Sequence, residues 1–284
     1  MGLLLRLAGQ WIAGEKAEDG IDKVKKANSK GILGLLNLLG EHIESKEAVQ
    51  STVKEYTRVL DLISESKVNS HISIKPTQMG LNIDQDYCLA NYLRVAEECA
   101  THSNNYLWID MENSPYTQKT IDLYSKVLSK YPFTGIAIQS YLRRSEADVK
   151  HLMPLGAKIR LVKGAYNEDP KIAFKSRNQV TENYAQLLSI LFNESSSDNF
   201  FAVATHDGSM IDRSRQLSKQ APKANFEYEM LMGVRDNLKK ELALQGERVR
   251  EYIPYGPEWL SYSIRRIKEK KSNILLLGRS LFTQ

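Results

Sequence analysis

Residues 158–206 have the sequence KIRLVKGAYNEDPKIAFKSRNQVTENYAQLLSILFNESSSDNFFAVATH, in which two short apolar runs flank a longer periodic segment. The runs at 158–163 and 201–206 are typical of strands in a parallel sheet that is covered on both faces. Between them, apolar side chains recur at helical spacing from Val180 to Leu191, which predicts an amphipathic helix. The stretch therefore predicts one strand–helix–strand unit.

The same alternation extends along the chain in both directions. The strand candidates are 31–39, 71–75, 106–111, 135–139, 158–163, 201–206, 224–230 and 249–255. Eight strands alternating with helices over about 250 residues predict an α/β fold, a (β/α)₈ TIM-like barrel. A doubly wound Rossmann sheet is the alternative, but Gly31 and Gly34 do not have the spacing of its glycine-rich motif. We expect a short N-terminal helical arm over residues 1–30 and a single barrel domain over residues 31–284.

Composition excludes several classes of protein. With 42% hydrophobic and 26% charged residues, the chain of 284 residues is typical of a globular protein. Its net charge of +5 comes from basic residues interspersed with acidic ones, so we expect no nucleic-acid partner. No apolar run reaches the roughly 20 residues of a transmembrane helix, and the N-terminus lacks a signal-peptide core. We expect a cytoplasmic protein with at most peripheral contact at the inner face of a membrane, and with Cys88 and Cys99 reduced.

Polar residues gather where the predicted strands end. Because catalytic groups of barrels lie at the carboxyl ends of the strands, these residues predict a polar pocket with several cations. They are Lys75, Asp110, Gln139, Arg160, Lys163, Thr205, His206, Asp207, Glu229, Tyr252 and Tyr255.

The segment RLVKGAY at 160–166 is the most distinctive of these strand ends. Alternation along a strand lets Arg160 point into the barrel mouth, and Gly164 lets a ligand approach the backbone closely. The segment therefore predicts an anion or cofactor site.

The segment after the last strand places Tyr262, Arg265, Arg266 and Glu269 on one helical face. That face is either an exposed ion pair or a clamp for a carboxylate, and the pattern leaves both open. The five histidines lack metal-ligand spacing, so we expect no metal site, and hydrolase and P-loop motifs are absent. Pattern alone thus predicts a barrel enzyme that acts on a small anionic ligand.

Several motifs in this order resemble the FAD-dependent proline dehydrogenase family, in its monofunctional form, from about Gly31 to Phe282. The motifs are Ser73–Lys75, Trp108–Ser114, Ile138–Leu142, Arg160–Tyr166, Ala204–Asp207, Glu229–Gly233, Arg250–Gly256 and Tyr262–Arg266.

The resemblance implies that L-proline is oxidised to Δ1-pyrroline-5-carboxylate by hydride transfer from ring carbon C5 to the flavin, the first step of proline catabolism. It also implies a quinone as electron acceptor and a separate pyrroline-5-carboxylate dehydrogenase downstream. Two alternatives remain open: oxidation of hydroxyproline or another cyclic secondary amine, and a ligand-binding barrel subunit of an electron-transfer complex.

The resemblance also implies roles for individual residues. Asp110 and Arg160 would be catalytic, with Arg160 beside the flavin ring. The substrate would be bound by Lys75, Leu231, Tyr252, Tyr262, Arg265 and Arg266. FAD would be contacted by Met111, Gln139, Lys163, Gly164, Ala165, Thr205 and His206. The chain departs from the family pattern at Asn113 and at Asp207, which places a negative charge close to the expected cofactor.

Overall fold

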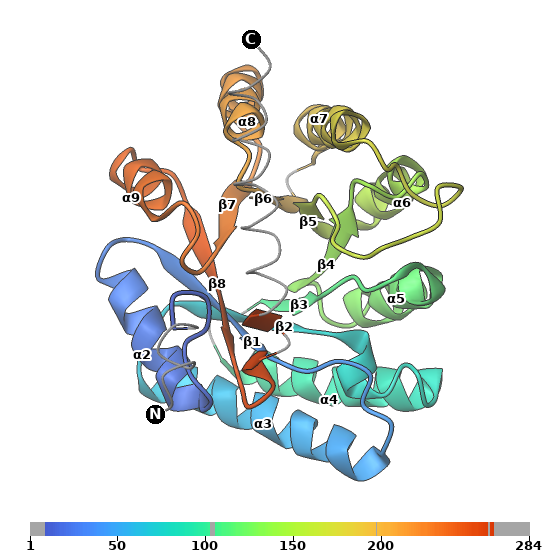
Figure 1. Cartoon of the computed structure of the whole chain (residues 1–284), viewed down its shortest axis with the longest axis vertical. Helices are drawn as coiled ribbons and strands as arrows, with labels where there is room; N and C mark the ends of the chain where they lie inside the picture. Colours follow the sequence, from blue (N-terminus) through green and yellow to red (C-terminus); the bar gives the residue numbers. More distant parts are fainter. Residues whose placement is uncertain (1–8, 103–105, 197, 261, 264–284) are drawn as a thin grey trace, which may run out of the picture.

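Eight parallel strands form a closed barrel in the computed structural model, which describes residues 9–102, 106–196, 198–260 and 262–263 (Figure 1). The strands are β1 (Leu33–Leu38), β2 (Ser70–Ile74), β3 (Leu107–Ile109), β4 (Thr134–Gln139), β5 (Lys158–Val162), β6 (Phe200–Ala204), β7 (Phe226–Leu231) and β8 (Val249–Tyr255). The α-helices in these residues are α2 (Ala17–Asn28), α3 (Lys46–Glu65), α4 (Gln85–Thr101), α5 (Ser114–Leu128), α6 (Ser145–Leu152), α7 (Arg177–Glu194), α8 (Gly208–Gln220) and α9 (Asp236–Leu244). Two short 3₁₀ helices are η1 (Pro76–Met79) and η2 (Met153–Leu155).

The barrel prediction is confirmed. Each strand pairs in parallel with its neighbour in the sequence, and β8 closes the ring by pairing with β1. Observed and predicted strand limits differ by no more than two residues at either end. Closure excludes the doubly wound alternative, which would leave two open sheet edges.

The helix that covers the junction between β1 and β8 comes before the barrel in the sequence. A Cβ added to Gly20 of α2 would lie 2.8 Å from Leu36 of β1 and 3.6 Å from Tyr255 of β8. The buried face of α2 consists of Ala17, Gly20, Ile21, Val24 and Ala27. The helix within the predicted N-terminal arm thus forms part of the barrel wall, while the domain boundary at residue 30 stays a prediction.

Other expectations about the helices also agree with the structure. The predicted stripe lies on α7, where Tyr184, Leu187 and Leu191 are buried. Cys88 and Cys99 both lie in α4 as buried free thiols. In the described ranges, every helix is too short or too polar to cross a bilayer.

Alternate residues of each strand face either the helices or the barrel interior. Outward residues such as Leu36, Ile109 and Leu161 join the main apolar core beneath the helices. A separate interior cluster contains Leu35, Trp108, Phe200 and Ala202. The interior also holds buried charged residues, namely Asp110, Arg160, Glu227, Glu229 and Arg250.

Trp108 can lie inside the barrel because residue 135 on the neighbouring strand is glycine. A Cβ on Gly135 would lie 2.4 Å from two carbons of the Trp108 ring. Real side chains do not approach that closely, so any larger residue must displace the indole.

We predict that Gly135→Ala lowers the free energy of unfolding by about 1–3 kcal/mol through overpacking, measured by chemical denaturation. Gly208→Ala is the matched control, because an added Cβ there lies 3.4 Å from its nearest neighbour, the tip of the Arg235 side chain. Equal losses in both variants would show that the Trp108 contact is not the cause.

Candidate active site

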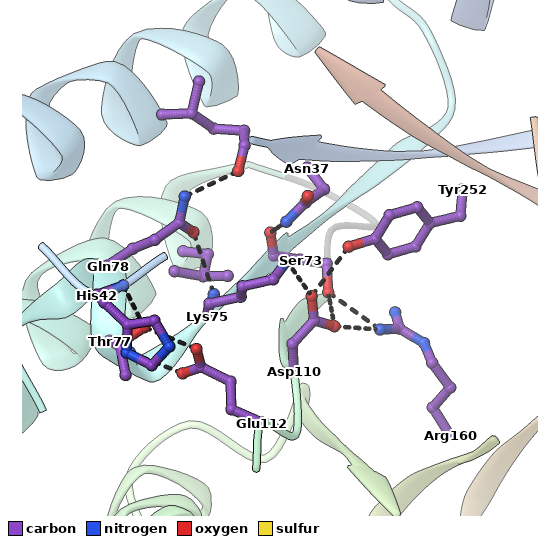
Figure 2. Close-up of polar contacts among 12 residues, drawn as sticks. Asn37, His42, Ser73, Lys75, Thr77, Gln78, Asp110, Glu112, Arg160 and Tyr252 are labelled. Atoms are coloured by element: carbon purple, nitrogen blue, oxygen red, sulfur yellow. Dashed lines mark hydrogen bonds and ion pairs between the residues drawn. The ribbon is translucent and has the colours of Figure 1, made fainter. Parts of the chain in front are cut away.

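Asp110, which directly follows β3, joins four elements at the carboxyl end of the barrel (Figure 2). Its Oδ1 accepts hydrogen bonds from Ser73 Oγ at 2.6 Å and from Arg160 Nη1 at 2.9 Å. Its Oδ2 accepts one from the Tyr252 hydroxyl at 2.9 Å and lies 3.5 Å from Lys75 Nζ. Residues on or next to β2, β3, β5 and β8 thus converge on one carboxylate.

This environment keeps Asp110 ionised. Burial alone would raise the pKa of its carboxyl, but Lys75, Arg160 and the hydrogen bonds from Ser73 and Tyr252 hold that pKa below its ordinary value. Burial raises the pKa of the Tyr252 phenol well above its ordinary value. Tyr252 therefore remains a neutral hydrogen-bond donor to an anionic Asp110.

Arg160 is 3% exposed and lies between two carboxylates. Opposite Asp110, its Nε lies 2.6 Å from Glu229 Oε2. Its guanidinium carbon lies 4.5 Å from the centre of the Trp108 ring and 5.8 Å from that of Tyr252. Among the described residues, its Nη2 has no hydrogen-bond partner. Arg160 is thus a buried cation, held by salt bridges and aromatic rings, with unused donor capacity.

A second pair of charges, Glu227 and Arg250, lies deeper in the barrel next to Glu229. Glu227, two residues earlier on β7, accepts hydrogen bonds from Arg250 Nε at 2.6 Å and Nη2 at 3.1 Å. Arg250 also donates to the Gly34 carbonyl at 2.8 Å. Burial raises the pKa of Glu229 to about 7, although Arg160 and Arg250 oppose the shift. Glu229 therefore binds a proton more readily than an exposed glutamate does.

Glu112 anchors the neighbouring part of the barrel mouth (Figure 2). It is fully buried and accepts hydrogen bonds from the Thr77 N–H at 2.8 Å and the Thr77 hydroxyl at 2.6 Å. The Gln139 side chain donates to the Glu112 carbonyl at 2.9 Å, and the His42 N–H donates to Thr77 Oγ1 at 2.9 Å. Burial raises the pKa of Glu112. These contacts tie β4 and the loop after β1 to η1.

The residues predicted to contact FAD lie at or just beyond the ends of β3 to β6. Gln139 is engaged with Glu112 as described, and Met111 and Thr205 are buried. Gly164 has a φ of +104° and is exposed, as is Ala165. A Cβ on Gly164 would lie 2.2 Å from the Tyr141 ring, so glycine is required there.

Lys163 and His206 each contact a neighbouring strand end. Lys163 Nζ lies 2.6 Å from Asp207 Oδ2. Burial opposes the shift, but hydrogen bonds from Lys163 and Ser209 lower the pKa of Asp207. The negative charge of Asp207 is therefore balanced by Lys163. His206 Nε2 accepts a hydrogen bond from the Leu231 N–H at 3.0 Å, which fixes the end of β7.

The predicted substrate residues are only partly brought together. Lys75 and Tyr252 meet at Asp110, and Leu231 lies at the end of β7 beside His206. Tyr262 is 8% exposed and packs in a small cluster with Ile12 and Leu39. Arg265, Arg266 and Glu269 lie outside the described residues. The assignment of substrate and cofactor residues as a whole stays a prediction.

Three interior residues of the cluster were assigned no individual role: Ser73 and Trp108 were not predicted as site residues, and Glu229 was predicted only as one of the polar residues of the pocket. Each lies two positions before a predicted site residue: Ser73 before Lys75, Trp108 before Asp110, and Glu229 before Leu231. Residues two apart in a strand share a face, so alternation was the signal that could have identified them.

Three comparisons relate the chain to known proteins. Residues 20–276 match the family model described as proline dehydrogenase. The chain is 36% identical to Proline dehydrogenase 2 of Bacillus subtilis over 269 residues, which cover 94% of this chain and 88% of the relative. It is 33% identical to Proline dehydrogenase of Deinococcus radiodurans over 274 residues, 94% of this chain and 87% of that protein.

A solved structure of proline utilization A from Bdellovibrio bacteriovorus, inactivated by N-propargylglycine, has a TM-score of 0.83 at 21% identity. The match covers 92% of this chain but 32% of the larger protein. At this identity the likeness concerns the fold alone.

We predict that Asp110→Asn lowers the free energy of unfolding by about 3 kcal/mol at pH 7, because it leaves Arg160 and Lys75 underbalanced at a buried site. Since the folded-state pKa of Asp110 is depressed, its stabilisation is present above the ordinary value of 3.8 and is lost as the pH falls through the folded value. Denaturant unfolding at several pH values should show the two proteins converging below about pH 4. Glu146→Gln, at the exposed ion pair with Lys150, is the control and should have little effect. A stability gap that persists unchanged at pH 3 would refute this account.

Proposed function

We propose that this chain, which belongs to the proline dehydrogenase family, oxidises L-proline to Δ1-pyrroline-5-carboxylate with FAD as its cofactor, the first step of proline catabolism. The observation that carries the proposal is the cluster of Lys75, Asp110, Arg160 and Tyr252 at the mouth of a barrel that matches the family over residues 20–276.

The described residues fit a flavin at this mouth. Arg160 Nη2 is a buried donor without a partner among them, available to an acceptor atom of a ligand. Gly164 exposes its backbone at the exit of β5 in a conformation that favours glycine. A bound FAD would supply the two-electron chemistry, accepting a hydride from ring carbon C5 of proline.

The protein's own residues would bind and orient the substrate. The Lys75 ammonium lies at the mouth with its side chain 14% exposed, where it can pair with the proline carboxylate. Leu231 and Tyr252 would bound the space for a small ring, and orienting C5 in this way contributes to the rate. Asp110 holds Lys75, Arg160 and Tyr252 in fixed relative positions. The cationic Arg160 would stabilise negative charge that develops beside it.

The electron acceptor and the next enzyme are further parts of the proposal. We propose a quinone as acceptor, reached by peripheral contact with a membrane, and transfer of the product to a pyrroline-5-carboxylate dehydrogenase. Comparing reoxidation by a soluble quinone analogue with reoxidation by oxygen tests the first of these.

We predict that the purified protein is yellow after incubation with FAD and that L-proline bleaches its flavin absorption under anaerobic conditions. Absorption spectra before and after addition of proline measure this directly. A protein that takes up no FAD would contradict the proposed cofactor, and faster bleaching by hydroxyproline than by proline would contradict the proposed substrate.

We predict that Lys75→Met raises the KM for proline at least about tenfold while FAD binding is retained, because a desolvated carboxylate loses its charged partner. Steady-state kinetics together with flavin content separate the two effects. Lys158→Met is the control: Lys158 begins β5 at the opposite end of the barrel and donates to the carbonyls of Gly156 and Asp198. Unchanged proline affinity in Lys75→Met would remove Lys75 from the substrate site.

A further inference from the structure

Glu229 is a buried carboxyl group that the proposed reaction does not use. It is 3% exposed, and its Oε2 lies 2.6 Å from Arg160 Nε. Its Oε1 has no hydrogen-bond partner within the described part of the chain. The ion pair is therefore one-sided, and Glu229 has spare capacity for a proton on the oxygen that does not face Arg160.

Among the buried titratable groups in this part of the barrel, Glu229 is the one suited to gain or lose a proton near neutral pH. Burial, together with Arg250 and Arg160, lowers the pKa of His71 well below its ordinary value, and His71 Nδ1 accepts the Trp108 N–H at 3.3 Å. His71 is therefore neutral at pH 7. The charged groups that act on Glu229 itself are Arg160 of β5, Glu227 of β7 and Arg250 of β8, and Glu229 in turn contributes to the raised pKa of the buried Tyr184 phenol on α7. His71 of β2, Asp110 after β3 and Tyr252 of β8 act on Arg160, the partner of Glu229.

Their charges at neutral pH follow from the contacts already described. Asp110 is an anion, Tyr252 is a neutral phenol, and both arginines are cations. Glu227 is engaged by two N–H groups of Arg250. With Glu229 ionised, Arg160 has a carboxylate on each side. With Glu229 protonated, Asp110 alone balances Arg160.

We propose that Glu229 is a positioning residue for the reaction, one that holds the Arg160 guanidinium in place and, by binding or releasing one proton, sets how much positive charge Arg160 presents at the barrel mouth. The proton comes from solvent and returns to it, and no electrons or covalent bonds are involved. The inference rests on the proposed function in one respect, that Arg160 lies beside the flavin.

The physical effect is large enough to measure. Charges a few ångströms apart interact strongly at the effective dielectric constant of a protein interior, so one added carboxylate alters the stabilisation of negative charge near Arg160. Because burial raises the pKa of Glu229 to about 7, protonation dominates below neutral pH and the carboxylate above it. The potential of a flavin beside Arg160 should therefore fall more steeply with pH in this range.

The first experiment needs no cofactor. Infrared spectra of the apoprotein, made with ¹³C-carboxyl glutamate, should show a protonated carboxyl band that disappears as the pH rises through about 7. Glu229→Gln should lack this band. In Glu229→Asp the carboxyl belongs to an unlabelled aspartate, so its band should appear at the frequency of an unlabelled carboxyl. If the wild type shows no carboxyl band that titrates through about pH 7, or if the spectra of the wild type and Glu229→Gln coincide over this range, Glu229 does not hold this proton and the proposal fails.

The second experiment measures the midpoint potential of bound FAD against pH by spectroelectrochemistry. The wild type should show an additional downward inflection near pH 7. Glu229→Gln keeps an acceptor for Arg160 but cannot ionise, so it should lack the inflection and lie at a more positive potential above pH 7, converging with the wild type below pH 6. Coincident profiles for the two proteins would overturn the proposal.

Glu227→Gln is the matched control. It removes a buried carboxylate two residues away on the same strand, but one that contacts Arg250 instead of Arg160. It should retain the inflection, and loss of the inflection in this variant too would mean that interior charge in general, not Glu229, sets the profile. A protein that binds no flavin would refute the proposed cofactor, while the infrared experiment would still decide whether Glu229 titrates.

Discussion

The architecture of the site depends on one constraint, that the charge of the buried Arg160 guanidinium must be balanced by groups around it. A cation that is 3% exposed is tolerated only if its charge and its N–H groups are balanced nearby. Asp110 and Glu229 provide that balance from opposite sides, and Asp110 in turn engages Ser73, Lys75 and Tyr252. The positions of Lys75 and Tyr252 are thus tied, through Asp110, to how this one cation is accommodated.

The barrel has to make room for this arrangement. Gly135 leaves space for Trp108, whose ring face lies against Arg160. Deeper in the interior, Glu227 and Arg250 are joined to each other by two hydrogen bonds. The Arg160 cluster lies nearer the mouth. The barrel interior thus contains balanced charges and not only apolar side chains. These charges form fixed, poorly solvated dipoles at the place where the proposed chemistry develops charge.

The fold was predictable from the sequence because its signals are local. Apolar runs predict strands such as Phe200–Ala204, and apolar residues at helical spacing predict helices such as Arg177–Glu194. Eight alternations of strand and helix are compatible with few architectures. The meeting of Lys75, Asp110, Arg160 and Tyr252 was predictable only as a shared barrel end, since the family resemblance, not spacing, implied their roles. Which oxygen of Asp110 binds which partner depends on register across the barrel, which no local pattern encodes. Glu229 was predicted as part of the polar pocket, but its contact with Arg160 was not, because a glutamate in a strand gives no indication of what faces it.

The placement of α2 has a consequence for how the chain reaches its native state. This helix is synthesised before any strand of the barrel, yet its buried face packs on both the first and the last strand. The part of this face around Gly20, which packs against Tyr255, therefore stays uncovered until β8 has been synthesised, more than two hundred residues later. Contacts of such long sequence separation slow folding and prolong the exposure of apolar surface. Closure of the barrel between β1 and β8 is thus the last step of its assembly. Just before that step the nascent chain exposes apolar surface and is most prone to associate with other chains.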